Sequence, residues 1–181
     1  ASGAQHRIGF SHYRYTFFHN HRLSSSADFW KKEPTHSAEQ QLALLGFTGV
    51  PVEDKPKSFL KVNKKAQNSI EEKLKSAIPN LKSEIALIHP VAAFETKQWA
   101  TEKFAETADF LSEKGLQIVA VATKKERVVL EKLQKLSNAP IAAFDDLSLP
   151  EIIALASRAR IFAGNDSGIA HIAAAVNTPS V

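Results

Sequence analysis

Residues 160–176 read RIFAGNDSGIAHIAAAV, and this stretch decides the fold of the chain. The run Ile161–Ala163 is short and apolar, which is typical of a buried strand, and the small residues of Ile169–Val176 predict a helix. The free N–H groups at the start of such a helix, together with its positive dipole end, favour a bound phosphate. The turn Asn165–Gly168 is therefore the expected place for a ligand's phosphates.

The same strand-then-helix step occurs three times upstream of this stretch. Strands are predicted at Ile85–Ile88, Gln117–Ala122 and Ile141–Phe144, because each is a continuous apolar run. Four strands that alternate with helices predict an α/β fold, a parallel sheet with helices on both faces. The helices are expected to begin near Thr101, where Gly115 ends the helix, at the Thr123 and Glu126 capping box, and at Ser148 before Pro150. Thr178–Val181 is expected to enter one more strand.

The first 80 residues have less regular patterns. Arg7–Phe10 predicts a short strand, Tyr13–Phe18 fits either a second strand or a loop, and Ser24–Ser26 predicts a turn. A helix is expected from Ser37, with Gln40 completing its capping box and Gly46 closing it. Another helix is expected from Asn63 to Pro79, with Ile70, Leu74 and Ile78 on one apolar face. We therefore divide the chain into residues 1–80 and residues 81–181.

The amino-acid composition limits the class of protein and its cellular compartment. The chain has 181 residues, of which 44% are hydrophobic and 23% charged, an ordinary globular mixture. No apolar run approaches the roughly 20 residues of a membrane span, and no secretory signal opens the chain. The chain lacks Cys, which weakly favours a reducing compartment, and it lacks Met, so we expect it to begin and end within a longer protein.

The charge distribution is uneven near the beginning of the chain. The net charge is +4, and no acidic residue precedes Asp28. This segment fits an anionic surface, which would be a phosphorylated glycolipid, a membrane or a nucleic acid; the alternative is a solvated surface without a partner. No metal site is expected from its His residues, which lack a carboxylate or Cys partner at ligand spacing. The segment contains Arg7, Arg14 and Arg22 with His6, His12, His19 and His21.

Ligands of open α/β sheets bind beyond the carboxyl ends of the strands. Four segments follow strand ends here and are expected to converge on one crevice, His89–Trp99, Thr123–Glu126, Asp145–Ser148 and Gly164–His171. In the last segment, Ser167 can donate a hydroxyl and Gly168 lets an anion approach the backbone, while His171 lies one turn into the helix. Asp166 is expected to cap the helix or to accept from a sugar hydroxyl, and both interpretations stay open.

The other three segments contribute weaker candidates. Lys97 would reach a diphosphate as a point charge, or else it is a solvated lysine. Ala92 and Ala93 are small enough for the backbone to lie close to a ligand. Glu126 is either a helix cap or the acceptor for ribose hydroxyls, and Leu147 lies where a base would pack.

Three motifs in residues 84–181 together resemble the donor-binding domain of glycosyltransferase family 9, the bacterial heptosyltransferases, and residues 1–80 match the late part of its acceptor domain more loosely. The first motif is Ile88-His89-Pro90 with Lys97-x-Trp99 and Phe104-Ala105-Glu106. The second runs from Asp146 to Glu151 before a helix ending Ala156-x-Arg158-Ala159. The third runs from Phe162 to Gly168, then x-x-His171-x-Ala173-Ala174-Ala175, followed by Thr178-Pro179.

The resemblance implies a GT-B architecture, with a Rossmann-like donor domain at 81–181 and the end of the acceptor domain with a linker at 1–80. It implies inverting transfer of a heptose from an ADP-activated donor to the lipopolysaccharide core, with no cofactor or required metal and no nucleic-acid partner. The implied location is cytoplasmic, with peripheral contact at the inner membrane. By this likeness the diphosphate and sugar are bound by Lys97, Ala92, Ala93, Asp166, Ser167, Gly168 and His171, and the nucleoside by Glu126 and Leu147.

The chain departs from the family at several positions. Val91 stands where Gly usually follows His-Pro, Ala122 and Thr123 replace favoured Gly residues, and Ala92 and Ala93 lack phosphate-binding hydroxyls. The family's general base, an Asp, is expected before Ala1, so no catalytic residue is assigned. The alternative to an enzyme is a non-catalytic nucleotide- or glycolipid-binding module of the same fold. A nicotinamide-dependent oxidoreductase is disfavoured, because no Gly-x-Gly-x-x-Gly follows any predicted strand.

Overall fold

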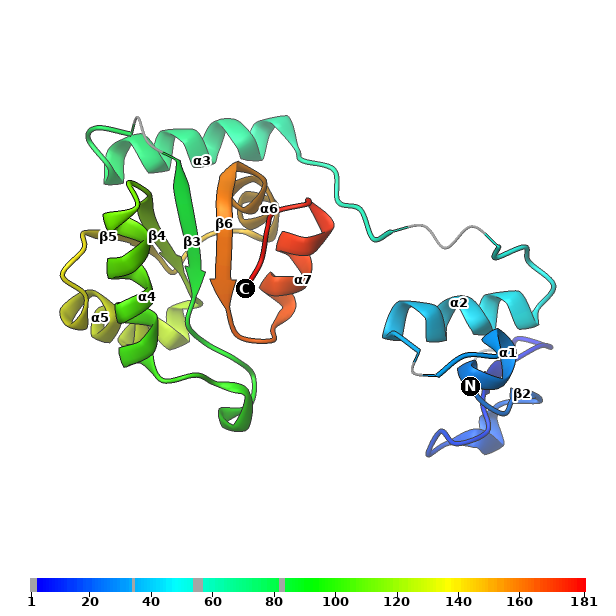
Figure 1. Ribbon diagram of the computed structural model, residues 1–181. Coiled ribbons are helices and arrows are strands. Elements are labelled where there is room, and N and C mark those ends of the chain that lie inside the picture. Colours follow the sequence, from blue (N-terminus) through cyan, green and yellow to red (C-terminus); the bar gives the residue numbers. More distant parts are fainter. Residues whose placement is uncertain (1–2, 34, 54–56, 82–83) are drawn as a thin grey trace. The chain divides into compact units, whose positions relative to one another are not determined.

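The computed structural model describes residues 3–33, 35–53, 57–81 and 84–181. Two compact units make up the chain, residues 1–57 and residues 58–181, and each is described by itself (Figure 1).

The second unit is built on a parallel sheet, as the alternating pattern predicts. Its strands are β3 (Ile85–His89), β4 (Gln117–Val121), β5 (Ile141–Phe144) and β6 (Ala159–Gly164). The spatial order is β5-β4-β3-β6, and every neighbouring pair is parallel. Beyond β6, Ser180 forms a parallel bridge with Phe162, so the segment expected to enter another strand does run along the sheet.

Helices cover both faces of this sheet, which confirms the predicted layers (Figure 1). Because side chains of a strand alternate, Ala86 and Ile88 face one core while Ile85 and Leu87 face the other. The first core is covered by α4 (Thr101–Glu113) and α5 (Arg127–Leu136). The second is covered by α3 (Lys64–Ala77), α6 (Leu149–Arg158) and α7 (Gly168–Ala175).

Local signals set most helix ends in this unit. The Asn63 side chain accepts hydrogen bonds from the N–H groups of Lys65 and Ala66 and so caps α3. Ser148 forms a reciprocal capping box with Glu151 at the start of α6. Gly115 follows α4 with a φ of 85°, a left-handed conformation that favours glycine. These ends agree with the prediction.

The division of the chain differs from the predicted boundary near residue 80. Helix α3 belongs to the second unit, where Ile70 and Leu74 are fully buried in the core shared with α6. The carboxylate of Glu151 accepts a hydrogen bond of 2.8 Å from the Ser69 hydroxyl and lies 3.1 Å from the Lys73 ammonium. Glu151 thus caps its own helix and joins α6 to α3.

The first unit is smaller and contains a two-stranded parallel sheet. Its strands, β1 (Ile8–Phe10) and β2 (His21–Leu23), are followed by α1 (Ser26–Trp30) and α2 (Ser37–Phe47). Phe10, Leu23 and Ala43 form its buried core. The aromatic segment after β1 is a loop with one short 3-10 helix, η1 (Thr16–Phe18), so of the two interpretations the loop is confirmed.

Three local predictions for the first unit are wrong. The expected turn at Ser24–Ser26 is instead the start of α1, which Ser25 caps by accepting from the Asp28 N–H. Helix α2 is capped by His36 and Glu39 rather than by Ser37 and Gln40. Gly46 lies inside α2, where an added Cβ would meet the Phe29 ring, and the left-handed glycine that follows the helix is Gly49.

The role of Glu151 predicts a pH dependence of stability. Hydrogen bonds from Ser148, then from Ser69, lower the pKa of the Glu151 carboxyl from 4.5 to about 2. A lowered carboxyl pKa stabilises the fold above pH 4.5, and this contribution is lost as the pH falls toward 2. We expect Glu151→Gln to lower the free energy of unfolding at pH 7 by about 1–3 kcal/mol. Denaturant titrations from pH 7 to pH 2 should show a flatter profile for this variant below pH 4.5.

Glu106→Gln is the matched control, because Glu106 is exposed and pairs only with Lys103 three residues before it among the described contacts. Parallel pH profiles of Glu151→Gln and the unchanged chain would contradict the assignment.

Candidate functional site

The four segments that follow strand ends do converge on one crevice, as predicted. The crevice has a volume of about 470 Å³ and lies at the carboxyl ends of β3, β4, β5 and β6. Small and apolar side chains form much of it, with carboxylates at one end. The lining residues are His89, Val91, Ala92, Ala93, Val121, Ala122, Thr123, Lys124, Glu126, Asp145, Asp146, Leu147, Ile152, Ser167, Gly168 and Ile169.

The strand order places this crevice at a reversal of the chain path. From β3 the chain moves outward to β4 and β5, and then returns to the other side of β3 as β6. The loops after β3 and β6 therefore leave the sheet in opposite directions, which opens a gap between them. The structure thus combines an open parallel sheet with a crevice at its topological switch point, where ligands of this fold class bind.

The turn that the sequence predicts to bind phosphate, Asn165–Gly168, follows β6 directly. Ser167 and Gly168 line the crevice, and helix α7 begins at Gly168. A Cβ added to Gly168 would meet no atom within 4 Å, so packing does not demand glycine here and open space lies above its backbone. The start of α7 therefore offers N–H groups and a positive dipole end to an anion in the crevice.

The predicted role of Asp166 as a helix cap is wrong. The cap is Ser167, whose hydroxyl accepts from the Ala170 N–H at 3.4 Å. Asp166 is exposed, and one of its carboxylate oxygens accepts a hydrogen bond of 2.5 Å from Lys97. The other oxygen lies 4.0 Å from Nε2 of His171. Lys97, which lies 69 positions before Asp166, thus joins Asp166 and His171 in one cluster of ionisable side chains beside the Asn165–Gly168 turn.

His89 is a site residue that the sequence did not single out. It is buried at the end of β3, and its Nδ1 lies 2.8 Å from the Val121 carbonyl at the end of β4. Burial lowers the pKa of His89, although the hydrogen bond to Val121 and the nearby Glu126 charge oppose this. The neutral ring therefore donates Nδ1–H to Val121 and ties the two strand ends together beneath the crevice.

The carboxylates gather at the end of the crevice formed by β4 and β5. One Glu126 oxygen accepts from the N–H and the hydroxyl of Thr123, so the capping interpretation of Glu126 is confirmed. The same residue lines the crevice, so its expected contact with ribose stays a prediction. Leu147 lines the crevice and packs against the core, and Asp145 is held 3.0 Å from Arg127.

The loop after β3 brings small residues to the crevice. Val91 is buried, and Ala92 and Ala93 line the crevice beside it. No side chain at these two positions carries a hydroxyl, so polar contacts there must come from the backbone. Phosphate binding at this loop would then depend on N–H groups and on the nearby Lys97.

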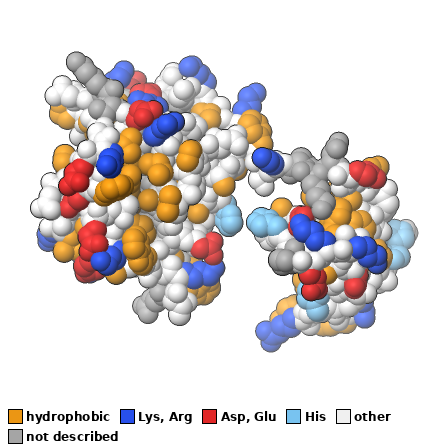
Figure 2. All heavy atoms as spheres, in the orientation of Figure 1, with side chains coloured by type: hydrophobic (Ala, Val, Ile, Leu, Met, Phe, Trp, Pro, Cys, Tyr) orange, Lys and Arg blue, Asp and Glu red, His pale blue; other side chains and the backbone are white. Residues whose placement is uncertain are grey.

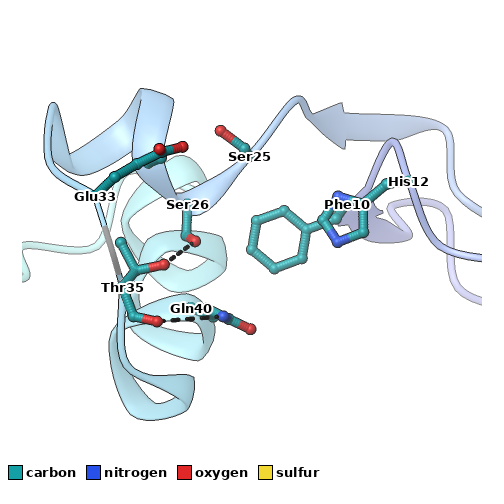
Figure 3. Close-up of a pocket in the computed structure, with 8 residues that line it drawn as sticks. Phe10, His12, Ser25, Ser26, Glu33, Thr35 and Gln40 are labelled. Carbon is teal, nitrogen blue, oxygen red and sulfur yellow. Dashed lines mark hydrogen bonds between the residues drawn. The ribbon is translucent and has the colours of Figure 1, made fainter.

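The first unit has a polar hollow of its own, with a volume of about 550 Å³ (Figure 3). It lies beyond the carboxyl ends of β1 and β2, where Phe10 and Ser25 border it. The Ser26 and Thr35 hydroxyls are 2.7 Å apart, and the Gln40 amide donates to the Thr35 carbonyl at 3.4 Å. The remaining lining residues are His12, Ala27 and Glu33. Hydroxyl, amide and imidazole groups in a hollow are suited to a sugar.

The loop after β1 exposes basic and aromatic side chains. Tyr15, Phe17 and Phe18 are exposed, and the Arg14 guanidinium lies over the Tyr15 ring at 5.5 Å. In contrast, Arg7 donates to the carbonyls of Ala4 and Phe18 and holds the loop in place. Basic and hydrophobic side chains are visible together on this unit in Figure 2.

Among the described residues, no group of three or more His, Asp or Glu side chains is arranged to hold a metal ion. No described helix has the length and apolar character needed to cross a membrane.

The fold and crevice define the class of protein: an α/β domain of the Rossmann-like type with an accessible helix start at its switch point. Comparison with known proteins gives the family. The chain belongs to glycosyltransferase family 9 (heptosyltransferase), whose family model matches residues 1–181.

Two curated relatives illustrate the likeness. Lipopolysaccharide heptosyltransferase 3 of Escherichia coli is 35% identical over 99 residues, which are 52% of this chain and 29% of that protein. Lipopolysaccharide core heptosyltransferase OpsX of Haemophilus influenzae is 26% identical over 149 residues, which are 81% of this chain and 41% of that protein. The matched segments thus span less than half of these relatives.

Solved structures share the fold. A family 9 glycosyl transferase from Veillonella parvula has a TM-score of 0.79 at 19% identity, covering 98% of this chain and 50% of that one. The E. coli ADP-heptose lipopolysaccharide heptosyltransferase II has a TM-score of 0.76 at 20% identity, covering 99% of this chain and 56% of that one. The GT-B-like fold class that the motifs implied is confirmed.

The charged cluster makes a prediction for the free protein. The hydrogen bond and charge of Lys97 hold the pKa of the Asp166 carboxyl below its ordinary value of 3.8. We expect Lys97→Met to raise the Asp166 pKa toward that value, as measured by carboxyl-carbon NMR. Lys103→Met, which removes an exposed lysine paired elsewhere, should leave it unchanged. An equal Asp166 pKa in all three proteins would show that the ion pair does not form in solution.

Proposed function

We propose that this chain binds an ADP-sugar in the second unit as part of a heptosyltransferase-like, inverting glycosyltransferase. The observation that carries the proposal is the crevice, which joins an anion-binding helix start to a carboxylate-bearing end. A nucleoside diphosphate matches the two ends of this crevice, because it carries phosphates at one end and ribose hydroxyls toward the other. The family supplies the class of donor, because its members in the comparison are named for heptose transfer.

The diphosphate belongs at the start of α7. There Ser167 can donate its hydroxyl, Gly168 leaves the backbone accessible, and Lys97 lies beside the turn through its pair with Asp166. Asp166 itself repels phosphate, so it and His171 are assigned to the sugar hydroxyls. Ala92 and Ala93 would let the opposite loop close on the ligand through its backbone.

The nucleoside belongs at the β4–β5 end of the crevice. Glu126 would accept from ribose hydroxyls with the carboxylate that Thr123 orients. The base would pack between apolar side chains, with Leu147 on one wall and Ile152 nearby. This arrangement needs no metal ion to bind the nucleotide.

The catalytic step assigned to the residues around the start of α7 is the departure of the diphosphate from the donor sugar. In an inverting transfer, an acceptor hydroxyl attacks the anomeric carbon from the face opposite the bond that breaks, and ADP leaves with that bond's electrons. The helix dipole, Ser167 and Lys97 would stabilise the charge that develops on the leaving diphosphate. No described residue is assigned as the general base that removes the acceptor proton.

The acceptor is assigned to the first unit. Its polar hollow suits sugar hydroxyls, and the exposed basic and aromatic side chains of the same unit suit phosphate groups and a membrane interface. A phosphorylated glycolipid of the lipopolysaccharide core, presented at the cytoplasmic face of the inner membrane, combines these features. The alternative, a binding module without catalysis, would bind the same ligands and fail to transfer the sugar.

Nucleotide preference tests the donor assignment. By calorimetry, the chain is expected to bind ADP more tightly than UDP or GDP. Lys97→Met should weaken ADP binding by about 1.5–3 kcal/mol, the range of a charged hydrogen bond, while Lys103→Met should not change it. Equal affinities for the three nucleotides would count against the heptosyltransferase assignment.

Charge reversal tests the acceptor side. Each basic side chain near an anionic surface contributes about 1 kcal/mol, so Arg14→Glu should weaken binding to vesicles carrying a phosphorylated glycolipid by tenfold or more. The effect should shrink at high salt, because exposed charges are screened. Arg160→Glu makes the same charge change on an exposed residue of the second unit and serves as control. Equal losses from both variants would refute a specific role for Arg14.

A further inference from the structure

The side chain of Asn165 connects two loops that border the crevice. It lies at the end of β6 with only 7% of its surface exposed. Its Oδ1 accepts a hydrogen bond of 2.9 Å from the backbone N–H of Trp99, 66 positions earlier in the chain. Trp99 closes the loop that follows β3, so this bond fastens that loop to the phosphate-binding turn.

The two residues beside this bond carry the charged contact. Lys97 precedes Trp99 by two positions, Asp166 follows Asn165 directly, and these side chains form the exposed ion pair described above. The Trp99 ring packs edge-on against the buried Phe104 ring at 5.2 Å. The backbone at Trp99 is thereby held from two sides, by Asn165 and by helix α4. This partly buried bond thus fixes the place from which the exposed Lys97 side chain extends.

The amide nitrogen of Asn165 shows that this position is not optimised for stability. Nδ2 is buried and has no hydrogen-bond partner among the described residues. An unpaired buried donor is costly, whereas an apolar side chain of the same shape would avoid that cost. The acceptor oxygen, which Trp99 uses, is the feature that an apolar residue would lack.

We propose that Asn165 is a positioning residue for the nucleotide site: it fastens the Trp99 backbone so that Lys97 stands beside the phosphate-binding turn. This inference rests on the proposed function, since it assigns Lys97 to the donor diphosphate. Asn165 acts through Lys97 and need not touch the ligand. Substitution of Asn165 should therefore abolish the contribution of Lys97 to diphosphate affinity, and leave the affinity for the nucleoside unchanged.

A double-mutant cycle tests the coupling. Asn165→Leu keeps the side-chain shape and removes the acceptor. Calorimetry with ADP and adenosine would compare the unchanged chain, Asn165→Leu, Lys97→Met and the double variant. We expect Lys97→Met to weaken ADP binding by roughly tenfold to a hundredfold in the unchanged chain, as for loss of a charged hydrogen bond, and by less than about twofold in the Asn165→Leu background. Adenosine affinity should be the same in all four proteins.

Thr178→Val is the matched control for a merely structural effect. Thr178 is also 7% exposed, lies just after α7, and donates its hydroxyl to the Ala156 carbonyl in α6. This variant should lower Tm and leave both ADP affinity and the effect of Lys97→Met intact. Independent, additive effects of Asn165→Leu and Lys97→Met on ADP binding, or a parallel loss of adenosine binding, would overturn the proposal.

A readout without ligand separates this proposal from the proposed function. If Asn165 positions Lys97, Asn165→Leu should raise the Asp166 pKa toward that of the Lys97→Met variant, and should speed hydrogen exchange at the Trp99 amide. An unchanged Asp166 titration would overturn the positioning role even if ADP binds. Failure of the unchanged chain to bind ADP would refute the donor assignment, while the Asp166 titration would still decide whether Asn165 holds Lys97 in place.

Discussion

The contact between the carboxyl ends of β3 and β6 is the constraint on which the site depends. The two strands pair in parallel with Ile88 opposite Ala163 and His89 opposite Gly164. A Cβ at Gly164 would come within 3.0 Å of the His89 carbonyl oxygen and closer still to the Phe162 ring, so only glycine fits. Because this pairing runs to the last residue of each strand, the two following loops begin side by side.

Much of the second unit could be predicted from its sequence, because its signals are short-range. The strands are continuous apolar runs, and the capping boxes at Thr123 and Ser148 each span four consecutive residues. The convergence of four loops then follows from the general geometry of parallel sheets. Local pattern and global fold agree here, as expected for a sequence that specifies one structure.

The failures in the second unit have a different cause, which is dependence on distant contacts. Asp166 is as good a cap as Ser167 by residue type, and only the approach of Lys97 from the neighbouring loop assigns it to an ion pair. The attachment of α3 to the second unit depends on Glu151, which lies 82 positions from Ser69. Neither contact could be predicted from the local sequence pattern, because residues so far apart along the chain can lie at any distance in space.

The same charged cluster explains how a cation can be held ready for a ligand without being bound too tightly. Lys97 and Asp166 are about half exposed, and ion pairs of this kind are worth roughly 0–1 kcal/mol because solvent screens them. Exchanging Asp166 for a diphosphate therefore costs Lys97 little, while His171 stays near the released carboxylate as an alternative partner. A buried pair would have resisted this exchange, since separating it leaves an uncompensated charge. The exposed ion pair thus leaves the Lys97 ammonium free to exchange partners, while the Asn165 hydrogen bond to Trp99 holds the backbone from which Lys97 extends.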